Sequence, residues 1–495
     1  MKKNLTNKYI KAIAGVGFVG ILAITPSCKK SFLDVPAQAQ QASQIFWQTS
    51  DDATKGVNAI YAGLRAWGNT AFPAIAIEST GADEAEKGSS PTDATFFNSY
   101  DTFTVDASDG QLSGFWSAQY QNINYCNQVL DNVPKINMDA SLKARYLGEA
   151  KFIRALSYFR LVRAFGDVPL RLTVPKETNQ YNIPRSPKAT VYAQIEADLN
   201  DAASVLPQSY GAADLGRATK GAALGLHAKV AMYQKKWTDV LSLTNSVMTM
   251  GYSLLPNFEQ VFRIANENGP ESIFEIQCAL VVGNPGASNS QYSQVQGVRG
   301  SKGGGWGFNV PTAALAAAFD ITDPRRDATI IFRGETTPEG DVIPTDGDNP
   351  MYNQKSYVPF SLFQDGYNEG CQQNFRVMRY SDVLLMNAEA ANELGNPTQA
   401  ISSLEIVRAR ARQGNPAILP KITSTDQSTL RNAIWNERRV ELAMEYDRYF
   451  DVIRQGRGAA VFGVKGWKAN KNEIWPIPQT EIDLSGGLLT QNPGY

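Results

Sequence analysis

Histidine is almost absent from this chain of 495 residues, and that scarcity excludes several kinds of chemistry. The single histidine, His227, leaves a histidine-based catalytic triad or an imidazole metal site without a second ring. It falls in the middle of an expected helix, where we interpret it as a buried structural residue. We therefore expect no metal site and no cofactor.

Cysteine is also scarce, with four residues in the whole chain. Cys126, Cys278 and Cys371 are widely spaced and form no Cys-x-x-Cys pair, so the sequence predicts neither a zinc site nor a disulfide framework. We expect these three to be buried thiols. The fourth, Cys28, has a different context.

An apolar run near the N-terminus is too short to cross a membrane. Four lysines and no acid precede it, and about 14 residues from Ala12 to Thr25 form the run. This pattern is typical of a secretory signal peptide. Cys28 follows and indicates lipidation, although Thr25 stands where a lipoprotein signal normally has a branched aliphatic residue. We expect three parts: a signal peptide over 1–27, a lipidated tether over 28–43 and a single domain over 44–495.

The chain also lacks an excess of positive charge. Without residues 1–27 the chain has 43 basic and 48 acidic residues, a formal charge of −5. Nucleic-acid backbones are bound through clustered positive charge. The composition therefore argues against nucleic acid as a partner.

Helical hairpins are the main feature that the sequence does contain. Residues 375–412 predict two amphipathic helices separated by Gly395, with the small residues Ala388 and Ala400 allowing the two axes to approach closely. A second hairpin is expected over 219–250. Stacked hairpins of this kind are typical of tetratricopeptide-like proteins.

Other expected elements surround these hairpins. We predict helices at 51–65, 115–130, 140–165, 191–206 and 313–319, one long charged helix at 430–454, and a strand at 272–279. Two segments, at about 68–114 and 280–380, have no sustained period and are rich in glycine and aromatic residues. The predicted fold class is therefore mostly α, a tetratricopeptide-like scaffold of helical hairpins with large irregular insertions and minor β structure.

Five blocks of sequence, in order along the chain, resemble the SusD/RagB family of outer-membrane nutrient-binding lipoproteins. They are EAKFIRALSYFRLVRAFGDVPL (149–170), GRATKGAALGLHAKVAMY (216–233), VMRYSDVLLMNAEAANELG (377–395), WNERRVELAMEYDRYFDVIRQGR (435–457) and the terminal PIPQTEIDL with LTQNPGY. The resemblance implies a lipid anchor on Cys28 and a place outside the outer membrane of a Bacteroidetes-type cell. It also implies a glycan ligand that is delivered to a SusC-like TonB-dependent transporter, without catalysis.

Three alternatives stay open. A pure structural scaffold would form a complex with the transporter but bind no small ligand. A RagB-type member of the family would bind peptide in place of glycan. A glycoside hydrolase would need two carboxylates at a suitable separation. The prominent acids, however, lie on expected helices close to arginines, where ion pairing and solvation explain them better. These acids are Glu389, Glu437, Glu441 and Glu445, and the arginines are Arg408, Arg438 and Arg439.

Sugar rings are recognised by flat aromatic side chains together with polar groups at their edges, so we sought aromatic residues in the irregular segments. Trp306 lies between glycines and is the first candidate, followed by Trp67, Tyr100 and Tyr292. The family resemblance adds Asp83, which falls where many members have an acid near the ligand site. Three tryptophans within helical stripes are assigned to the core: Trp116, Trp237 and Trp435.

Overall fold

A computed structural model describes residues 46–177, 180–279, 281, 290–300, 304–362 and 372–495. The expected signal peptide, tether and Cys28 lie outside the described residues, as does Cys371. Residues Thr49–Tyr495 form one compact unit. Among the residues that the structure covers, no helix is long and apolar enough to cross a membrane.

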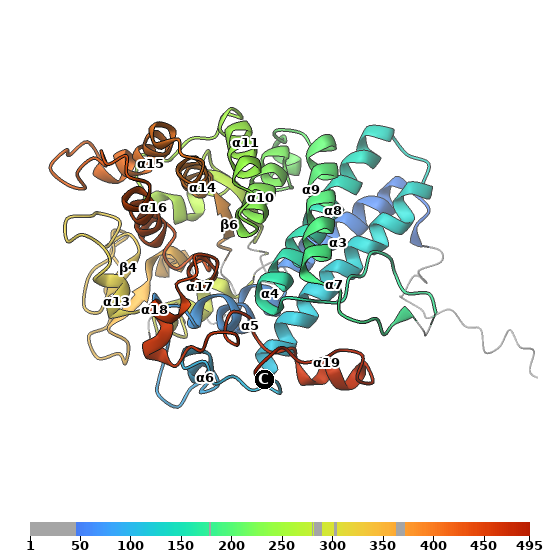
Figure 1. The fold of residues 1–495 in the computed structure, drawn as a ribbon, viewed down its shortest axis with the longest axis horizontal. Coiled ribbons are helices and arrows are strands. Elements are labelled where there is room, and N and C mark those ends of the chain that lie inside the picture. Colours follow the sequence, from blue (N-terminus) through green and yellow to red (C-terminus); the bar gives the residue numbers. More distant parts are fainter. Residues whose placement is uncertain (1–45, 178–179, 280, 282–289, 301–303, 363–371) are drawn as a thin grey trace, which may run out of the picture. The chain divides into compact units, whose positions relative to one another are not determined.

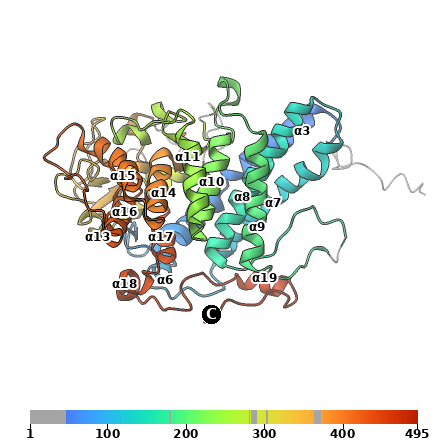
Figure 2. The ribbon, with the colours of Figure 1, turned by 45° about the horizontal axis from the view of Figure 1, so that its top comes forward.

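Long helices packed pairwise build most of this unit. α7 lies against α8, α8 against α9, α9 against α10, α10 against α11, α11 against α14, and α14 against both α15 and α16. Figures 1 and 2 show the row from the blue and cyan helices through the green ones to the orange and red ones. The bounds are α3 Ser50–Leu64, α7 Gly110–Asn132, α8 Ala140–Phe165, α9 Lys188–Val205, α10 Lys220–Tyr233, α11 Trp237–Met248, α14 Tyr380–Glu393, α15 Pro397–Arg412 and α16 Gln427–Glu441.

The α14–α15 hairpin forms as the sequence predicts. Gly395 has φ +74°, which favours glycine, and the Asn396 side chain caps α15. Ala388 and Ala400 are fully buried between the helices. The prediction is wrong at its start, because Phe375–Arg379 forms strand β6, which pairs with β2 (Ser272–Ile276).

The α10–α11 hairpin is also confirmed, with Thr219 capping α10. His227 on α10 is half-buried, and burial lowers its pKa. The assignment of tryptophans to the core holds for Trp116, which is 3% exposed. It is wrong for Trp237 and Trp435, which are only half-buried, because Trp237 begins its helix and both side chains line a cleft.

The single helix predicted over 430–454 is two helices, α16 and α17 (Arg448–Arg454). Met444 and Tyr446 between them adopt positive φ. The Lys355 amine and the Arg379 guanidinium donate to the backbone carbonyl of Glu441, the last residue of α16. Side chains thus bond to a carbonyl that would otherwise accept from a backbone N–H of the next helical turn. Tertiary contacts therefore end the helix where its sequence would continue it.

The two irregular segments meet in the structure. β1 (Ala85–Gly88) from the first pairs antiparallel with β3 (Phe308–Pro311) from the second. The first segment is less irregular than its sequence suggests, because it forms short helices that pack on the core. These are α4 (Trp67–Thr70), α5 (Phe72–Ile75), a π-helical turn (Ala76–Thr80) and α6 (Phe97–Asp101). The second contains α12 (Tyr292–Gln296), α13 (Ala313–Ala316), and the paired strands β4 (Ile330–Phe332) and β5 (Met351–Asn353).

The C-terminal tail closes over the first segment. It contains α18 (Gly458–Phe462) and α19 (Gln479–Leu484). Trp475 in this tail is fully buried, and its indole N–H donates to the Ile77 carbonyl. Its ring stacks on Phe103 with the centroids 6.0 Å apart. The tail thus holds the first segment against the rest of the unit.

Candidate functional site

Aromatic rings from the two remote segments form one cluster, which we call the aromatic platform: Trp67, Phe72, Phe96 and Trp306. Phe72 lies between the two tryptophans, with ring centroids 5.1 Å from Trp67 and 5.9 Å from Trp306. The ring centroids of Trp67 and Trp306 are 6.2 Å apart. Trp67 is 38% exposed and the other three are half-buried, so the platform presents ring surface to solvent.

Buried rings support the platform from below. Phe72 packs edge-on against Phe97 at 5.2 Å and against Phe308 at 4.8 Å. Both of these supporting rings are buried. Edge-to-face contacts of this kind hold rings in defined orientations. The exposed rings therefore stand on a packed aromatic base.

Trp67 is positioned by the close approach of α4 to α7. A Cβ added at Gly68 would lie 2.4 Å from the Gly114 carbonyl oxygen, so only glycine allows this contact. Trp67 is the first residue of α4. Its backbone therefore rests on a long helix of the scaffold.

Trp306 is positioned by glycines with a similar role. Its backbone N–H donates to the Gln294 carbonyl at 2.9 Å. A Cβ at Gly305 would lie 2.2 Å from the Gly297 carbonyl carbon, and Gly307 has φ +72°. The sequence shows Trp306 between glycines. The structure adds that they bring its backbone against residues 294–298.

A charged pair borders Trp306. Arg299 donates to the Trp306 carbonyl at 3.3 Å and to the Ser89 hydroxyl at 2.6 Å, and its guanidinium lies 2.8 Å from the Asp93 carboxylate. The Ser89 hydroxyl lowers the pKa of Asp93, which is therefore charged at neutral pH. Both members of the pair are about a third exposed. They offer a donor and an acceptor beside a flat ring.

Tyr100 and Tyr292 are not part of this surface. Tyr100 is fully buried, and its hydroxyl donates to Asp109 at 2.7 Å. Tyr292 is 6% exposed and packs edge-on against Phe375 at 4.9 Å. The correction has a common cause, since both lie on short helices whose packing could not be read from segments without a clear period.

Asp83 is held in an ion-paired cluster. Its carboxylate accepts from Arg448 at 2.6 and 3.0 Å and lies 2.8 Å from Arg439. Burial opposes its ionisation, but these guanidinium groups lower its pKa overall. The contacts tie the chain before β1 to α16 and α17. A role for Asp83 at a ligand stays a prediction.

The prominent acids of the sequence are held in ion pairs rather than solvated, and Glu389, Glu437 and Glu441 are buried. Arg325, which is fully buried, contacts Glu437 at 2.6 Å and Glu441 at 3.0 Å. Burial would raise the pKa of Glu441, but Arg410 and Arg379 hold it well below its usual range. In the part of the chain that the structure describes, no three His, Cys, Asp or Glu residues are arranged to hold a metal ion.

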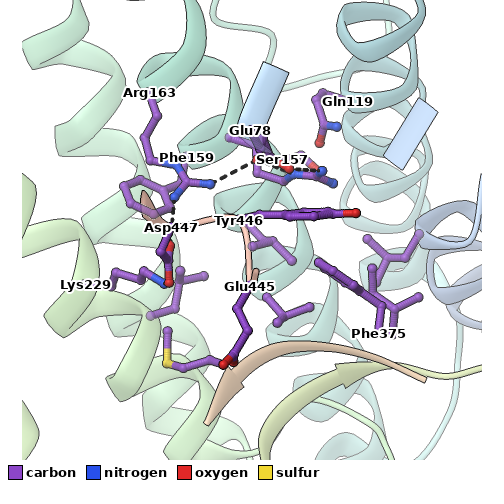
Figure 3. A pocket seen from close by; sticks show the side chains of 17 residues that line it. Glu78, Gln119, Ser157, Phe159, Arg163, Lys229, Phe375, Glu445, Tyr446 and Asp447 are labelled. Carbon is purple, nitrogen blue, oxygen red and sulfur yellow. Dashed lines mark hydrogen bonds and ion pairs between the residues drawn. The ribbon is translucent and has the colours of Figure 1, made fainter. Parts of the chain in front are cut away.

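An interior cavity lies between α8, α10 and β6 (Figure 3). Its volume of about 50 Å³ has room for one or two waters. Glu78 accepts from Arg160 at 2.6 Å and Arg163 at 3.1 Å, and Asp447 accepts from Lys229 at 2.6 Å. The charges that line the cavity compensate one another. It is too small for a sugar ring.

Comparison with known proteins decides the family. Residues 270–495 match the model described as "SusD family", and residues 31–232 match the one described as "Starch-binding associating with outer membrane". SusD-like protein P2 of Formosa agariphila is 30% identical over 482 residues, which cover 92% of this chain and 94% of the relative. The chain belongs to the SusD family. A SusD-like protein of Bacteroides ovatus is 27% identical over 86% of this chain and 79% of its own length.

Solved structures of SusD-like proteins share the fold. A laminarin-binding SusD-like protein matches with a TM-score of 0.79 at 29% identity, over 91% of this chain and all of its own. A SusD-like protein of Bacteroides fragilis NCTC 9343 matches with a TM-score of 0.78 at 26% identity, over 92% of this chain and 99% of its own. The predicted mostly α, tetratricopeptide-like fold class is confirmed.

Parts of the platform in this SusD-family chain were not identified from its sequence. Trp67 and Trp306 were singled out, whereas Phe72, Phe96 and the bordering pair Arg299 and Asp93 were not. Proximity in sequence could have pointed to them. Phe72 and Asp93 lie in the first irregular segment, which begins next to Trp67, and Arg299 precedes Trp306 by seven residues. The pairing of the two segments, which brings these residues together, could not be read from local pattern.

Proposed function

We propose that this SusD-family protein is a non-enzymatic, cell-surface lipoprotein that binds glycan on the aromatic platform. The carrying observation is the pair of indoles from remote segments, set around Phe72 and bordered by the Arg299–Asp93 pair. A pyranose has C–H faces that pack on such rings and hydroxyls that bond to the charged edge. The relative that binds laminarin, at 29% identity, supports a glycan ligand.

Titration of the purified protein with laminarin and laminarihexaose tests glycan binding. We expect saturable heat in isothermal calorimetry and no release of shorter sugars on prolonged incubation. Binding of peptides alone would favour a RagB-type protein, and sustained release of sugars would favour a hydrolase. If neither these sugars nor a panel of host and plant glycans binds, the proposal fails.

Trp306→Ala tests the platform directly. Loss of a stacking surface is expected to weaken glycan binding by about 1–3 kcal/mol, by analogy with bases stacked on aromatic residues. Trp67→Ala is expected to act in the same direction. Tyr181→Ala is the matched control, because Tyr181 is an aromatic residue, 58% exposed, that belongs to neither segment of the platform. If the Trp306→Ala, Trp67→Ala and Tyr181→Ala variants bind glycan with equal affinity, the platform is not the glycan-binding site.

Anchoring and delivery belong to the same proposal. We propose that residues 1–27 are removed, that residues 28–43 tether the domain through lipid on Cys28, and that the protein passes glycan to a SusC-like TonB-dependent transporter in the outer membrane. The family description "Starch-binding associating with outer membrane" supports this. Cys28→Ser is expected to release the protein from the membrane fraction. When the native protein is extracted with detergent and purified, we expect the transporter to be purified with it. If the transporter is absent even after cross-linking, this would count against delivery.

A further inference from the structure

A second pair of tryptophans lines a cleft on the helical scaffold. Trp237 comes from the start of α11, and Trp435 comes from α16. The cleft has a volume of about 290 Å³, and none of its lining residues belongs to the aromatic platform. Its remaining walls are Met232, Lys235, Glu389, Glu393, Arg431, Arg454 and Gln455.

Two bidentate ion pairs lie in the cleft. Arg454 donates to both carboxylate oxygens of Glu389, at 2.7 and 2.8 Å. Arg431 likewise donates to both oxygens of Glu393, and the hydrogen bond to one of them is 2.8 Å long. Glu389 also accepts from the Trp435 indole N–H at 3.0 Å. Each carboxylate is therefore neutralised and held in place.

These pairs indicate which ligand the cleft accepts. A charged ligand would have to break a compensated pair or remain partly unpaired, which is costly away from bulk water. Hydroxyl groups both donate and accept, so they can join the free N–H groups and lone pairs of an ion pair without breaking it. Lys235 is exposed, and solvent and salt screen its charge. A neutral polyhydroxyl ring therefore fits better than an anion.

The two indoles supply the surface for such a ring. The Arg457 guanidinium lies 5.5 Å from the Trp435 centroid and so covers part of that ring. Trp237, at the start of α11, is half-buried and lines the same cleft. Arg454 also lines a larger neighbouring groove of about 980 Å³, which gives a longer chain somewhere to continue.

We propose that the Trp237–Trp435 cleft is a second glycan subsite, which takes a neutral sugar ring of a longer chain. The proposal rests on the glycan-binding function proposed above and adds a separate place for it. Its physical consequence is that one protein engages a polymer at two positions, so that long chains bind more tightly than the platform alone allows.

Fluorine NMR of the protein labelled with 5-fluorotryptophan separates the two places. The chain contains eight tryptophans, and the four relevant signals can be assigned with single Trp→Phe variants. The probes are laminarihexaose, maltohexaose, cellohexaose, mannohexaose and xylohexaose, with an oligogalacturonate and a tetrapeptide as charged and peptide comparisons. We expect the Trp237 and Trp435 signals to shift saturably with at least one neutral sugar, including in the Trp67→Ala/Trp306→Ala double variant.

Every outcome bears on one proposal or the other. If the Trp237 and Trp435 signals stay fixed with all five neutral sugars, or respond only to the charged sugar or the peptide, the second subsite is overturned. The Trp67 and Trp306 signals report separately on the platform, so failure of the proposed function is seen independently.

Trp237→Ala provides the matched variant. The affinity of the cleft for the sugar, measured from the shift of the Trp435 signal, is expected to fall about fivefold or more. The affinity measured from the Trp67 signal is expected to stay unchanged. Thr238→Ala, the exposed neighbour on the same helix, is expected to leave both unchanged. The titration of the unsubstituted protein keeps the proposal falsifiable even if Trp237→Ala does not fold.

Discussion

At the scale of the residue, glycines decide where the platform rings lie. A tryptophan can stack on a ligand only if its backbone is held, and the Trp306 backbone is held by contact with residues 294–298. Gly305 makes that contact possible, because any side chain there would meet the Gly297 backbone. Trp67 depends on Gly68 in the same way. The residues that shape the site thus include some that need not touch a ligand.

Gly305→Ala is therefore expected to displace Trp306. The added Cβ would lie 2.2 Å from the Gly297 carbonyl carbon, a distance that requires the backbone to move. We expect a shifted Trp306 fluorine signal and weaker laminarihexaose binding. Gly211→Ala is the control, since nothing lies within 4 Å of a Cβ there. Unchanged binding in Gly305→Ala would show that this contact does not position the indole.

At the scale of the element, a buried acid contacts the break between α16 and α17. Glu84 accepts the Met444 N–H at 2.9 Å and is 1% exposed. Burial raises its pKa to about 8, and the nearby Arg448 only partly opposes this. Glu84 is therefore largely protonated in the folded protein at neutral pH, whereas in the unfolded chain it is ionised.

This difference predicts a pH dependence with a definite sign. Between the ordinary value of 4.5 and about 8, the folded state binds one more proton than the unfolded state, so stability falls as pH rises. Glu84→Gln keeps the acceptor for Met444 but removes the titration. We expect its free energy of unfolding, relative to the parent, to increase from pH 5 to pH 8 by at most about 1.4 kcal/mol per pH unit. Urea denaturation measures this, and parallel pH profiles would refute the protonated state.

At the scale of the whole molecule, buried ion pairs join the second irregular segment to the helical scaffold. Arg325 of that segment contacts Glu437 and Glu441 of α16 and is fully buried. Arg379 and Lys355 join the same group through Glu445. A charge left alone in such an interior is costly, so these pairs fix how the segment sits on the helices.

Arg325→Met is accordingly expected to destabilise the protein by about 3–5 kcal/mol, because it leaves the buried Asp323 carboxylate without its ion-pair partner and removes one of the partners of Glu437 and Glu441. Lys55→Met is the control. Lys55 pairs with Asp51 at 2.6 Å, but the two side chains are 61% and 71% exposed, and such pairs contribute about 0–1 kcal/mol. Chemical denaturation of both variants at neutral pH gives the comparison. Similar small losses would mean that the buried group is not structurally important.

The helical hairpins were determined by the sequence alone, because apolar period, caps and turn glycines act within a few residues: Gly395, Asn396 and Thr219 stand where the chain turns or a helix begins. Trp306 and Trp67 could be singled out for a similar local reason. The tertiary structure alone decided that these indoles meet through Phe72, that Tyr100 and Tyr292 are buried, and that the helix after Leu430 breaks. Each depends on contacts between residues far apart in the chain, such as the β1–β3 pairing and the charges around Glu441, which local pattern does not encode.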